Sequence, residues 1–317
     1  MKRWIGPVGA AAMALAALLF PLRASLAWGP EGHRAIALIA DRHLQQSDPG
    51  VRAKILSILA TDKGSRLTKN DIASEATWAD VLRDKSEEAR NATGFWHSAR
   101  FKPDNPDLAR ACFGRNPLPA GYPASHGPQD NCSIDKIEQF ASELKDPETS
   151  PGERLAALQF LLNLVGDLND PLYAIDRGDQ GGECVALQVG STAPVRLSSY
   201  WREVLVAEVV GPDPAKGAAR IAASVPAAEA QKWAEGNPEA WARETYEVAR
   251  SVTYSFAAGQ PEGKHSFPPR AGQAESCAAA DLYRVGPDYE TKALAAVRQQ
   301  LAKAGLRLAR VLRDSLK

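Results

Sequence analysis

Apolar residues recur at helical spacing along most of the chain. In the segment 31–44, Ile36 and Ile39 mark one face of a helix, and the segment 51–62 repeats the pattern. Ser133 is suited to cap another helix, because its hydroxyl can accept a hydrogen bond from a free backbone N–H. The pattern predicts helices at 31–44, 51–62, 133–146, 150–168, 239–256 and 290–316.

Two long stretches without a clear period interrupt these helices. Residues 102–131 and 258–289 are rich in proline and glycine, and we expect them to be surface loops. Only 185–190 and 204–210 have weak strand character. Because we find no internal repeat and no domain linker, we expect an all-α fold, a single helical domain over residues 28–317 whose long loops are tied by disulfides.

The first residues have the features of an export signal. Two basic residues precede an apolar, alanine-rich run, and residues 25–27 place small side chains at the cleavage-determining positions. An uncleaved membrane anchor is the alternative, but Pro21 and Arg23 interrupt the run and leave it short for a bilayer span. We predict a signal peptide at residues 1–27, cleavage before Trp28, and a mature protein that is periplasmic or secreted.

The charge of the chain excludes one way of binding nucleic acid. There are 38 basic and 38 acidic residues, and removal of residues 1–27 leaves 35 and 38, a net charge near −3. A protein of this charge has no overall positive field that attracts the phosphates of nucleic acid. A phosphate substrate would therefore need local positive charge, and bound metal ions are the obvious source.

The four cysteines, an even number in a chain predicted to be exported, indicate two disulfides. Four cysteines allow three connectivities. We favour Cys112–Cys132, which would close a proline-rich loop, together with Cys184–Cys277, which would connect two distant loops.

Candidate metal ligands begin at the predicted new N-terminus. Cleavage before Trp28 would free its α-amine, which binds metal when deprotonated, and His33 follows closely enough to share one ion. Taken alone, a buried tryptophan and a histidine at a helix start explain these residues more simply. Asp80 could be another ligand and Arg83, one helical turn later, could meet a phosphate; an exposed ion pair is the structural alternative.

Two further candidates lie in apolar surroundings. His97 is flanked by aromatic residues, where a buried structural histidine is the simpler interpretation. The central helix carries Asn163 and Asp167 four residues apart, hence on one face. A carboxylate in so apolar a helix is costly to bury without a cation or hydrogen-bond donors. A structural salt bridge or a metal ion would satisfy Asp167.

Taken in order, these segments resemble one known family. The segments WGPEGH, WADVLR, WH, FLLNLVGDLNDPL with DQGGE, and QLAKAGLRLARVL are similar to those of the S1/P1 nucleases, secreted zinc-dependent enzymes related to bacterial zinc phospholipase C. The resemblance covers the chain from Trp28 to the last helix, and the tryptophan directly after the cleavage site is its most specific element. It implies the helical bundle of that family.

The resemblance implies three zinc ions, two of which share the carboxylate of Asp167. Carried over position by position, the first ion has the ligands Trp28, His33 and Asp167, and the second has Asp80, His97, Asn163 and Asp167. Asn163 stands where the family has a histidine. Since an amide oxygen is a poorer zinc ligand than an imidazole, we expect this second site to be weakened.

The third zinc site of the family is not expected here. Its ligands would fall on Tyr173, Ser198 and Arg202, which replace two histidines and an aspartate. The fungal base pocket is altered too, since Ser98 and Arg100 stand where an aromatic and an acidic residue are expected. Arg202 leaves two hypotheses open: its guanidinium could offer positive charge to a phosphate, or it could pair with a surface acid.

The ligands that remain belong to the half of the site that generates the nucleophile. We therefore predict an exported zinc-dependent phosphoesterase of the endonuclease class, holding two zinc ions and using Asp80, Arg83 and Asp167 in catalysis. Its substrates would be single-stranded nucleic acid or small phosphoesters. Without the third ion to help the leaving group, we expect slow nuclease activity or a preference for easier phosphoesters.

Other functions remain as alternatives. A non-catalytic exported scaffold could keep the fold with one or two structural metals, because fold ancestry alone does not decide activity. A membrane-acting phospholipase has little support, since the basic C-terminal helix lacks aromatic anchors. We expect a monomer without stable membrane association.

Overall fold

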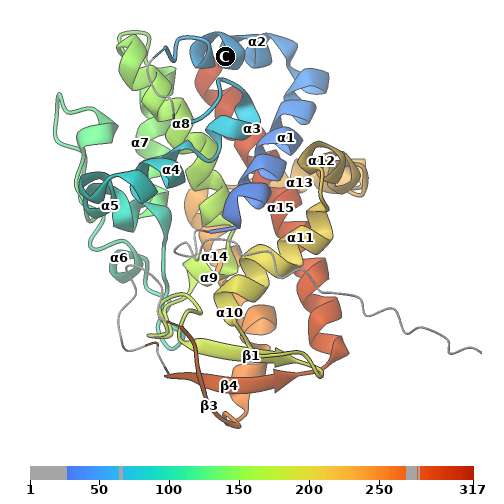
Figure 1. Cartoon of the computed structure of the whole chain (residues 1–317). Coiled ribbons are helices and arrows are strands. Elements are labelled where there is room, and N and C mark those ends of the chain that lie inside the picture. The colour runs from blue at the N-terminus through green and yellow to red at the C-terminus, as the bar shows by residue number, and fades with distance from the viewer. Residues whose placement is uncertain (1–26, 64–66, 269–276, 278) are drawn as a thin grey trace, which may run out of the picture.

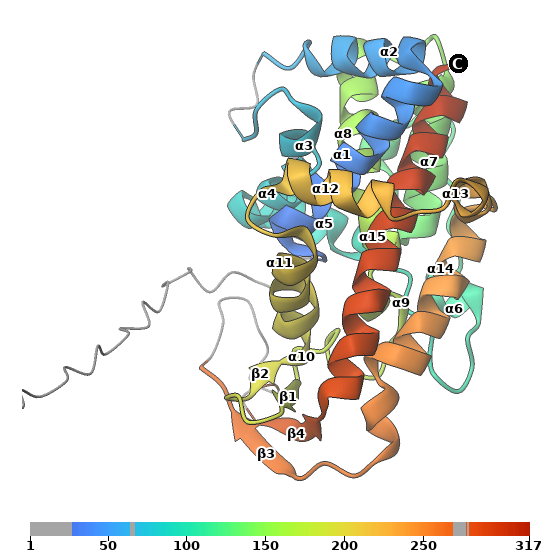
Figure 2. The same ribbon diagram turned by 90° about the vertical axis from the view of Figure 1, so that its right-hand side faces the viewer.

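Four long helices form the body of the molecule. The structure, a computed structural model, describes residues 27–63, 67–268, 277 and 279–317, so that all but the last residue of the predicted signal peptide lies outside it. The long helices are α1 (Gly29–Ser47), α7 (Ser133–Lys145), α8 (Pro151–Leu168) and α15 (Pro287–Leu316). α1 packs against α15, α7 packs against α8, and α15 contacts both α7 and α8 (Figures 1 and 2).

Shorter helices surround these four. Those that precede α7 are α2 (Pro49–Leu59), α3 (Ile72–Glu75), α4 (Trp78–Lys85), α5 (Glu87–Thr93), η1 (Gly94–His97), α6 (Leu108–Ala111) and η2 (Ala124–His126). Those between α8 and α15 are α9 (Pro171–Ala174), α10 (Leu197–Ser199), η3 (Tyr200–Val204), α11 (Leu205–Val210), α12 (Pro214–Ala223), α13 (Ala227–Ala234), α14 (Pro238–Val248), η4 (Ala249–Thr253) and η5 (Ser255–Ala258). Among the residues that the structure describes, no helix combines the length and the apolarity of a membrane span.

α8 lies at the centre because its sequence is apolar on every side. Ser150 caps the helix by accepting a hydrogen bond from a backbone N–H of the first turn, and Pro151 begins that turn. All residues from 157 to 168 are buried, and the apolar ones belong to one contiguous core. Asn163 and Asp167 therefore lie in the interior of the protein, where each polar atom needs a partner.

A small sheet of four strands lies at one end of the molecule, below the helices in Figure 1. Its strands are β1 (Val185–Val189), β2 (Val195–Arg196), β3 (Gly263–Ser266) and β4 (Ala279–Val285), in the order β2-β1-β4-β3. β1 and β4 run parallel, whereas the two outer pairs are antiparallel. The all-α prediction is therefore only approximate.

Local pattern was a poor guide to strands. β1 confirms the strand predicted at 185–190, but the prediction for 204–210 was wrong, since most of it forms α11. The β-branched residues of α11 accept a helical backbone because it buries their side chains against α1 and α15. The prediction of a loop over 258–289 was wrong in part, since β3 and β4 lie within it and pair with each other. β4 also pairs with β1, a strand far away in the sequence that no local pattern reveals.

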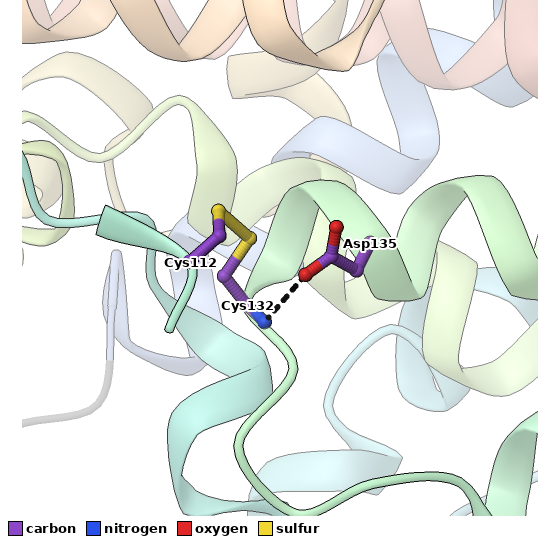
Figure 3. A group of neighbouring side chains, drawn as sticks. All are labelled: Cys112, Cys132 and Asp135. Atoms are coloured by element: carbon purple, nitrogen blue, oxygen red, sulfur yellow. Dashed lines mark hydrogen bonds between the residues drawn. A yellow bond between two sulfur atoms is a disulfide. The ribbon is translucent and has the colours of Figure 1, made fainter. Parts of the chain in front are cut away.

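Both favoured disulfides are confirmed, Cys112–Cys132 and Cys184–Cys277. Figure 3 shows Asp135 beside the first of them, where its carboxylate accepts a hydrogen bond from the backbone N–H of Cys132 at 3.2 Å. Since both sulfur atoms are used in the disulfide, this group of two cysteines and a carboxylate is a helix start and no metal site. The predicted cap was wrong by one residue: α7 begins at Ser133, and Cys132 occupies the cap position.

Candidate metal centre

Asp167 lies in the middle of a cluster of histidines and carboxylates. It belongs to the last turn of α8, and its side chain is fully buried. Its Oδ1 lies 3.2 Å from Nε2 of His33 on α1, and its Oδ2 lies 2.5 Å from Nδ1 of His97 in η1. A single carboxylate thus offers a separate oxygen to each of two imidazoles, which come from positions 33 and 97 of the chain.

Asp80 on α4 belongs to the same cluster. Its Oδ2 lies 3.6 Å from Nε2 of His33 and accepts a hydrogen bond from the side-chain amide of Asn163 at 3.1 Å. The same amide also donates to the carbonyl of Ala76 at 3.0 Å. Arg83 follows one turn after Asp80, with its Nη1 3.8 Å from Oδ1 of that carboxylate. The side chains of Asp80 and Arg83 are only 5% and 15% exposed, so the exposed ion pair is wrong.

The backbone at Trp28 reaches this cluster as well. Trp28 is fully buried, and its indole N–H donates to the carbonyl of Gly166 at 3.0 Å, one residue before Asp167. The backbone carbonyl of Ala27 lies close enough to the ring of His33 to raise the pKa of that histidine. The peptide bond between Ala27 and Trp28 therefore lies beside the imidazole, and cleavage there would leave an α-amine at the same place.

The two histidines have opposite pKa shifts. Burial lowers the pKa of His33, but the close carboxylate of Asp167 and the charge of Asp80 outweigh burial and raise this pKa to about 8. Burial and the charge of Arg83 lower the pKa of His97. Burial opposes the ionisation of Asp167, yet the charge of His97 and the contacts with both histidines hold its pKa below the usual range. Burial raises the pKa of Asp80 despite the charge of His33.

The donor atoms of the cluster suit zinc. Zinc in proteins takes imidazole nitrogen and carboxylate oxygen, and the cluster supplies two imidazoles and two carboxylates. The atoms of the cluster that are buried without a hydrogen-bond partner in the protein include Oδ1 of Asp80, Nε2 of His97 and Oδ1 of Asn163. Because an unpaired buried polar atom costs free energy, a bound cation would remove a penalty that the fold otherwise carries.

The residues at the position of the family's third zinc do not fit a metal. Nε of Arg202 in η3 donates to Oδ2 of Asp170 at 2.7 Å, and its guanidinium carbon lies 4.3 Å from the ring centre of Tyr173. Burial lowers the pKa of Arg202, but the charge and hydrogen bond of Asp170, together with Tyr173 and Glu183, outweigh burial and raise it. A permanent cation therefore lies where the family resemblance implies a zinc ligand, as the sequence predicted. The acid in this contact, Asp170, is buried, so the contact is not the surface ion pair of the second hypothesis.

The sequence did not reveal the importance of Asp170. This residue is fully buried and caps the N-terminus of α9, where its Oδ1 accepts a hydrogen bond from the backbone N–H of Leu172 at 2.8 Å. Its signal in the sequence was a second acid in the segment DLNDPL, three residues after Asp167. Nothing local connects it to Arg202, which lies 32 residues further along the chain.

Comparison with known proteins shows which proteins the chain is similar to. The family described as S1/P1 Nuclease matches residues 28–317. Endonuclease 4 of Arabidopsis thaliana is 22% identical over 309 residues, 92% of this chain and 90% of that protein. Nuclease S1 of Aspergillus oryzae is 28% identical over 167 residues, 53% of this chain and 49% of its own length. Nuclease P1 of Penicillium citrinum is 28% identical over 149 residues, 46% of this chain and 47% of its own. The aligned part of this chain thus spans about half the length of the two fungal relatives. This chain belongs to the S1/P1 nuclease family.

Proposed function

We propose that this protein is an exported zinc-dependent phosphoesterase of the endonuclease class, altered or impaired in substrate because it lacks a third metal site. The observation that carries the proposal is the carboxylate of Asp167, which offers one oxygen to His33 and the other to His97. A carboxylate in this arrangement is suited to bridge two metal ions. The nuclease names of its relatives support the reaction class.

Each proposed ion takes its ligands from the cluster. One would be held by the α-amine and carbonyl of a processed Trp28, by His33 and by Asp167. The other would be held by Asp80, His97, the amide oxygen of Asn163 and Asp167. When bound, such a pair of zinc ions supplies Lewis acidity and lowers the pKa of the attacking water.

The remaining roles belong to side chains of the chain itself. The amide of Asn163, by donating to both Asp80 and the carbonyl of Ala76, holds the carboxylate of Asp80 in one orientation. Arg83 keeps its guanidinium beside Asp80, and its Nε and Nη1 have no hydrogen-bond partner in the protein, so it would bind an oxygen of the phosphate. Asp80, Arg83 and Asp167 are therefore the catalytic residues of the proposal.

Export belongs to the same proposal. The family match begins at Trp28, directly after the predicted signal peptide of residues 1–27. The disulfides fit an oxidising compartment, either the periplasm or the outside of the cell. We propose that cleavage before Trp28 completes the first metal site, because only then is the α-amine free.

The proposed substrates are single-stranded nucleic acid or small phosphoesters. The negative charge near −3 after cleavage offers no overall attraction for polyphosphate, so binding would depend on the metal ions and on nearby arginines. A monomer formed by one domain over residues 28–317 is the proposed form. An inherited scaffold without activity is the alternative that the following experiment separates.

The test is the zinc content of the purified, signal-cleaved protein, measured by elemental analysis alongside cleavage of single-stranded DNA. We expect two zinc ions per chain in the wild type and the loss of both zinc and activity in Asp167→Ala. Asp176→Asn is the control for the zinc content, because Asp176 is a partly exposed acid that pairs with Lys102 at 2.6 Å and not with a residue of the cluster. If the wild type contains no zinc and Asp167→Ala folds unchanged, the proposed enzyme is wrong and the non-catalytic scaffold is the function that remains.

A further inference from the structure

Two arginines from distant parts of the chain meet at one tyrosine ring. The guanidinium carbon of Arg100 lies 5.3 Å from the ring centre of Tyr173, and that of Arg202 lies 4.3 Å from it. The backbone fixes Arg100 in this place, because the N–H groups of its two neighbours donate to the carbonyls of Tyr173 and Ala174, at 3.2 and 3.0 Å. Asp170 fixes Arg202 through its hydrogen bond of 2.7 Å.

Gly181, in the segment DQGGE, leaves a small space between the two guanidinium groups. A Cβ at this position would lie 3.5 Å from Nη2 of Arg100 and 3.7 Å from Nη2 of Arg202. It would also lie 3.3 Å from the carbonyl oxygen of Leu172. An oxygen atom in this space could therefore approach both arginines, which is how guanidinium groups bind phosphate.

The charges around this space favour an anion. Arg100 and Arg202 border it with two positive charges, while Asp170 supplies one negative charge through its bond to Arg202. Other acids lie nearby: Asp176 pairs with Lys102 at 2.6 Å, Glu183 lies 3.8 Å from Arg196, and Asp179 accepts a hydrogen bond from the hydroxyl of Tyr254 at 2.7 Å. The two guanidinium groups are the charged groups that directly border the space beside Gly181.

We infer that Arg100 and Arg202 form a metal-free site beside Gly181 that binds a phosphate oxygen of the substrate, at the position where the family resemblance placed a third zinc. This inference rests on the proposed function, since it assigns the site to the same phosphoester substrate. Arginine is always charged and needs no loading, so it can stabilise the negative charge that develops on the phosphate. Arg100, which is only half-buried, would make the first contact.

The test is calorimetric titration of the purified full-length mature protein with inorganic phosphate, with the zinc content of each sample measured. Arg100→Gln removes one cation, and Gly181→Ala fills the space. Gly178→Ala is the matched control: its φ of +74° imposes a backbone strain like that at Gly181, where φ is +68°, but its Cβ would meet no atom within 4 Å. We expect about tenfold weaker phosphate binding in Arg100→Gln and Gly181→Ala, at unchanged zinc content, and no such loss in Gly178→Ala.

The outcomes separate this inference from the proposed function. Phosphate binding that is equally strong in the wild type, Arg100→Gln and Gly181→Ala would overturn the arginine site, even if zinc is present. A third zinc ion in the wild type would overturn it as well. Protein without zinc whose phosphate binding still depends on Arg100 and Gly181 would support the arginine site while the proposed function fails.

Discussion

The cluster around Asp167 and the pair formed by Asp170 and Arg202 are both buried and polar, but only in the second does a permanently charged group contact a carboxylate at hydrogen-bond distance. In the cluster, atoms of Asp80, His97 and Asn163 have no hydrogen-bond partner in the protein. In the pair, a carboxylate and a guanidinium meet at 2.7 Å. Under the proposed function, the cluster would take metal ions from outside the chain, whereas the guanidinium of Arg202 would take the place of a third one.

The largest expected effect comes from breaking this buried pair. Asp170→Ala removes the carboxylate that faces the buried guanidinium of Arg202, so we expect the free energy of unfolding to fall by about 3–5 kcal/mol. Urea denaturation of the variant and the wild type, each with and without a chelator, measures this loss. The loss should be the same under both conditions, because the pair contains no metal.

Asp170→Asn is the control for the helix cap, since asparagine can still accept the backbone N–H of Leu172. We expect Asp170→Asn to lose the stabilisation that comes from the ion pair with Arg202. It should keep the hydrogen bond that caps α9. If Asp170→Ala costs less than about 1 kcal/mol, Arg202 finds another buried partner and the comparison between the two regions fails.

Removal of zinc should affect only the cluster. A ligand present at a hundred times its dissociation constant stabilises the folded state by about 2.7 kcal/mol, so we expect a chelator to lower the unfolding free energy of the wild type by about this amount. Asp167→Asn should be insensitive to the chelator. Equal sensitivity in the two proteins would show that Asp167 holds no ion. Thermal unfolding followed by circular dichroism gives the comparison.

Asn163→His tests the weakened ligand directly. An imidazole at this position would restore a stronger zinc donor, and we expect zinc affinity to rise about tenfold in competition with a chromophoric chelator. The variant also gives up the amide hydrogen bond to the carbonyl of Ala76, so its metal-free form should lose about 1 kcal/mol of stability. Unchanged affinity would remove Asn163 from the ligand set.

The smallest effect is expected at the surface. Asp176 and Lys102 form an ion pair whose side chains are 35% and 55% exposed, so solvent screens the attraction. Asp176→Asn should change the free energy of unfolding by no more than about 0.5 kcal/mol. A larger loss in the same urea denaturation would mean that burial is not what distinguishes Asp170 from Asp176.

The sequence by itself determined the main helices and the types of side chain that are candidate metal ligands. α1, α8 and α15 follow from apolar spacing within each segment, so the neighbours along the chain carry the information. Asp167 was noticeable because a carboxylate in an apolar helix needs a partner. The resemblance then named His33, His97 and Asp80, and the fold brings all of them to Asp167 or to each other.

Only the tertiary structure decided which distant groups complete one another. It brings Arg202 to Asp170 and Arg100 to Tyr173, and it pairs β4 with β1, although no local pattern connects these segments. It also turned the segment 204–210 into a helix, because burial against α1 and α15 outweighs the strand preference of its residues. A periodicity or a motif describes one short window, whereas a buried charge is satisfied by whichever group the packing of the whole chain places beside it.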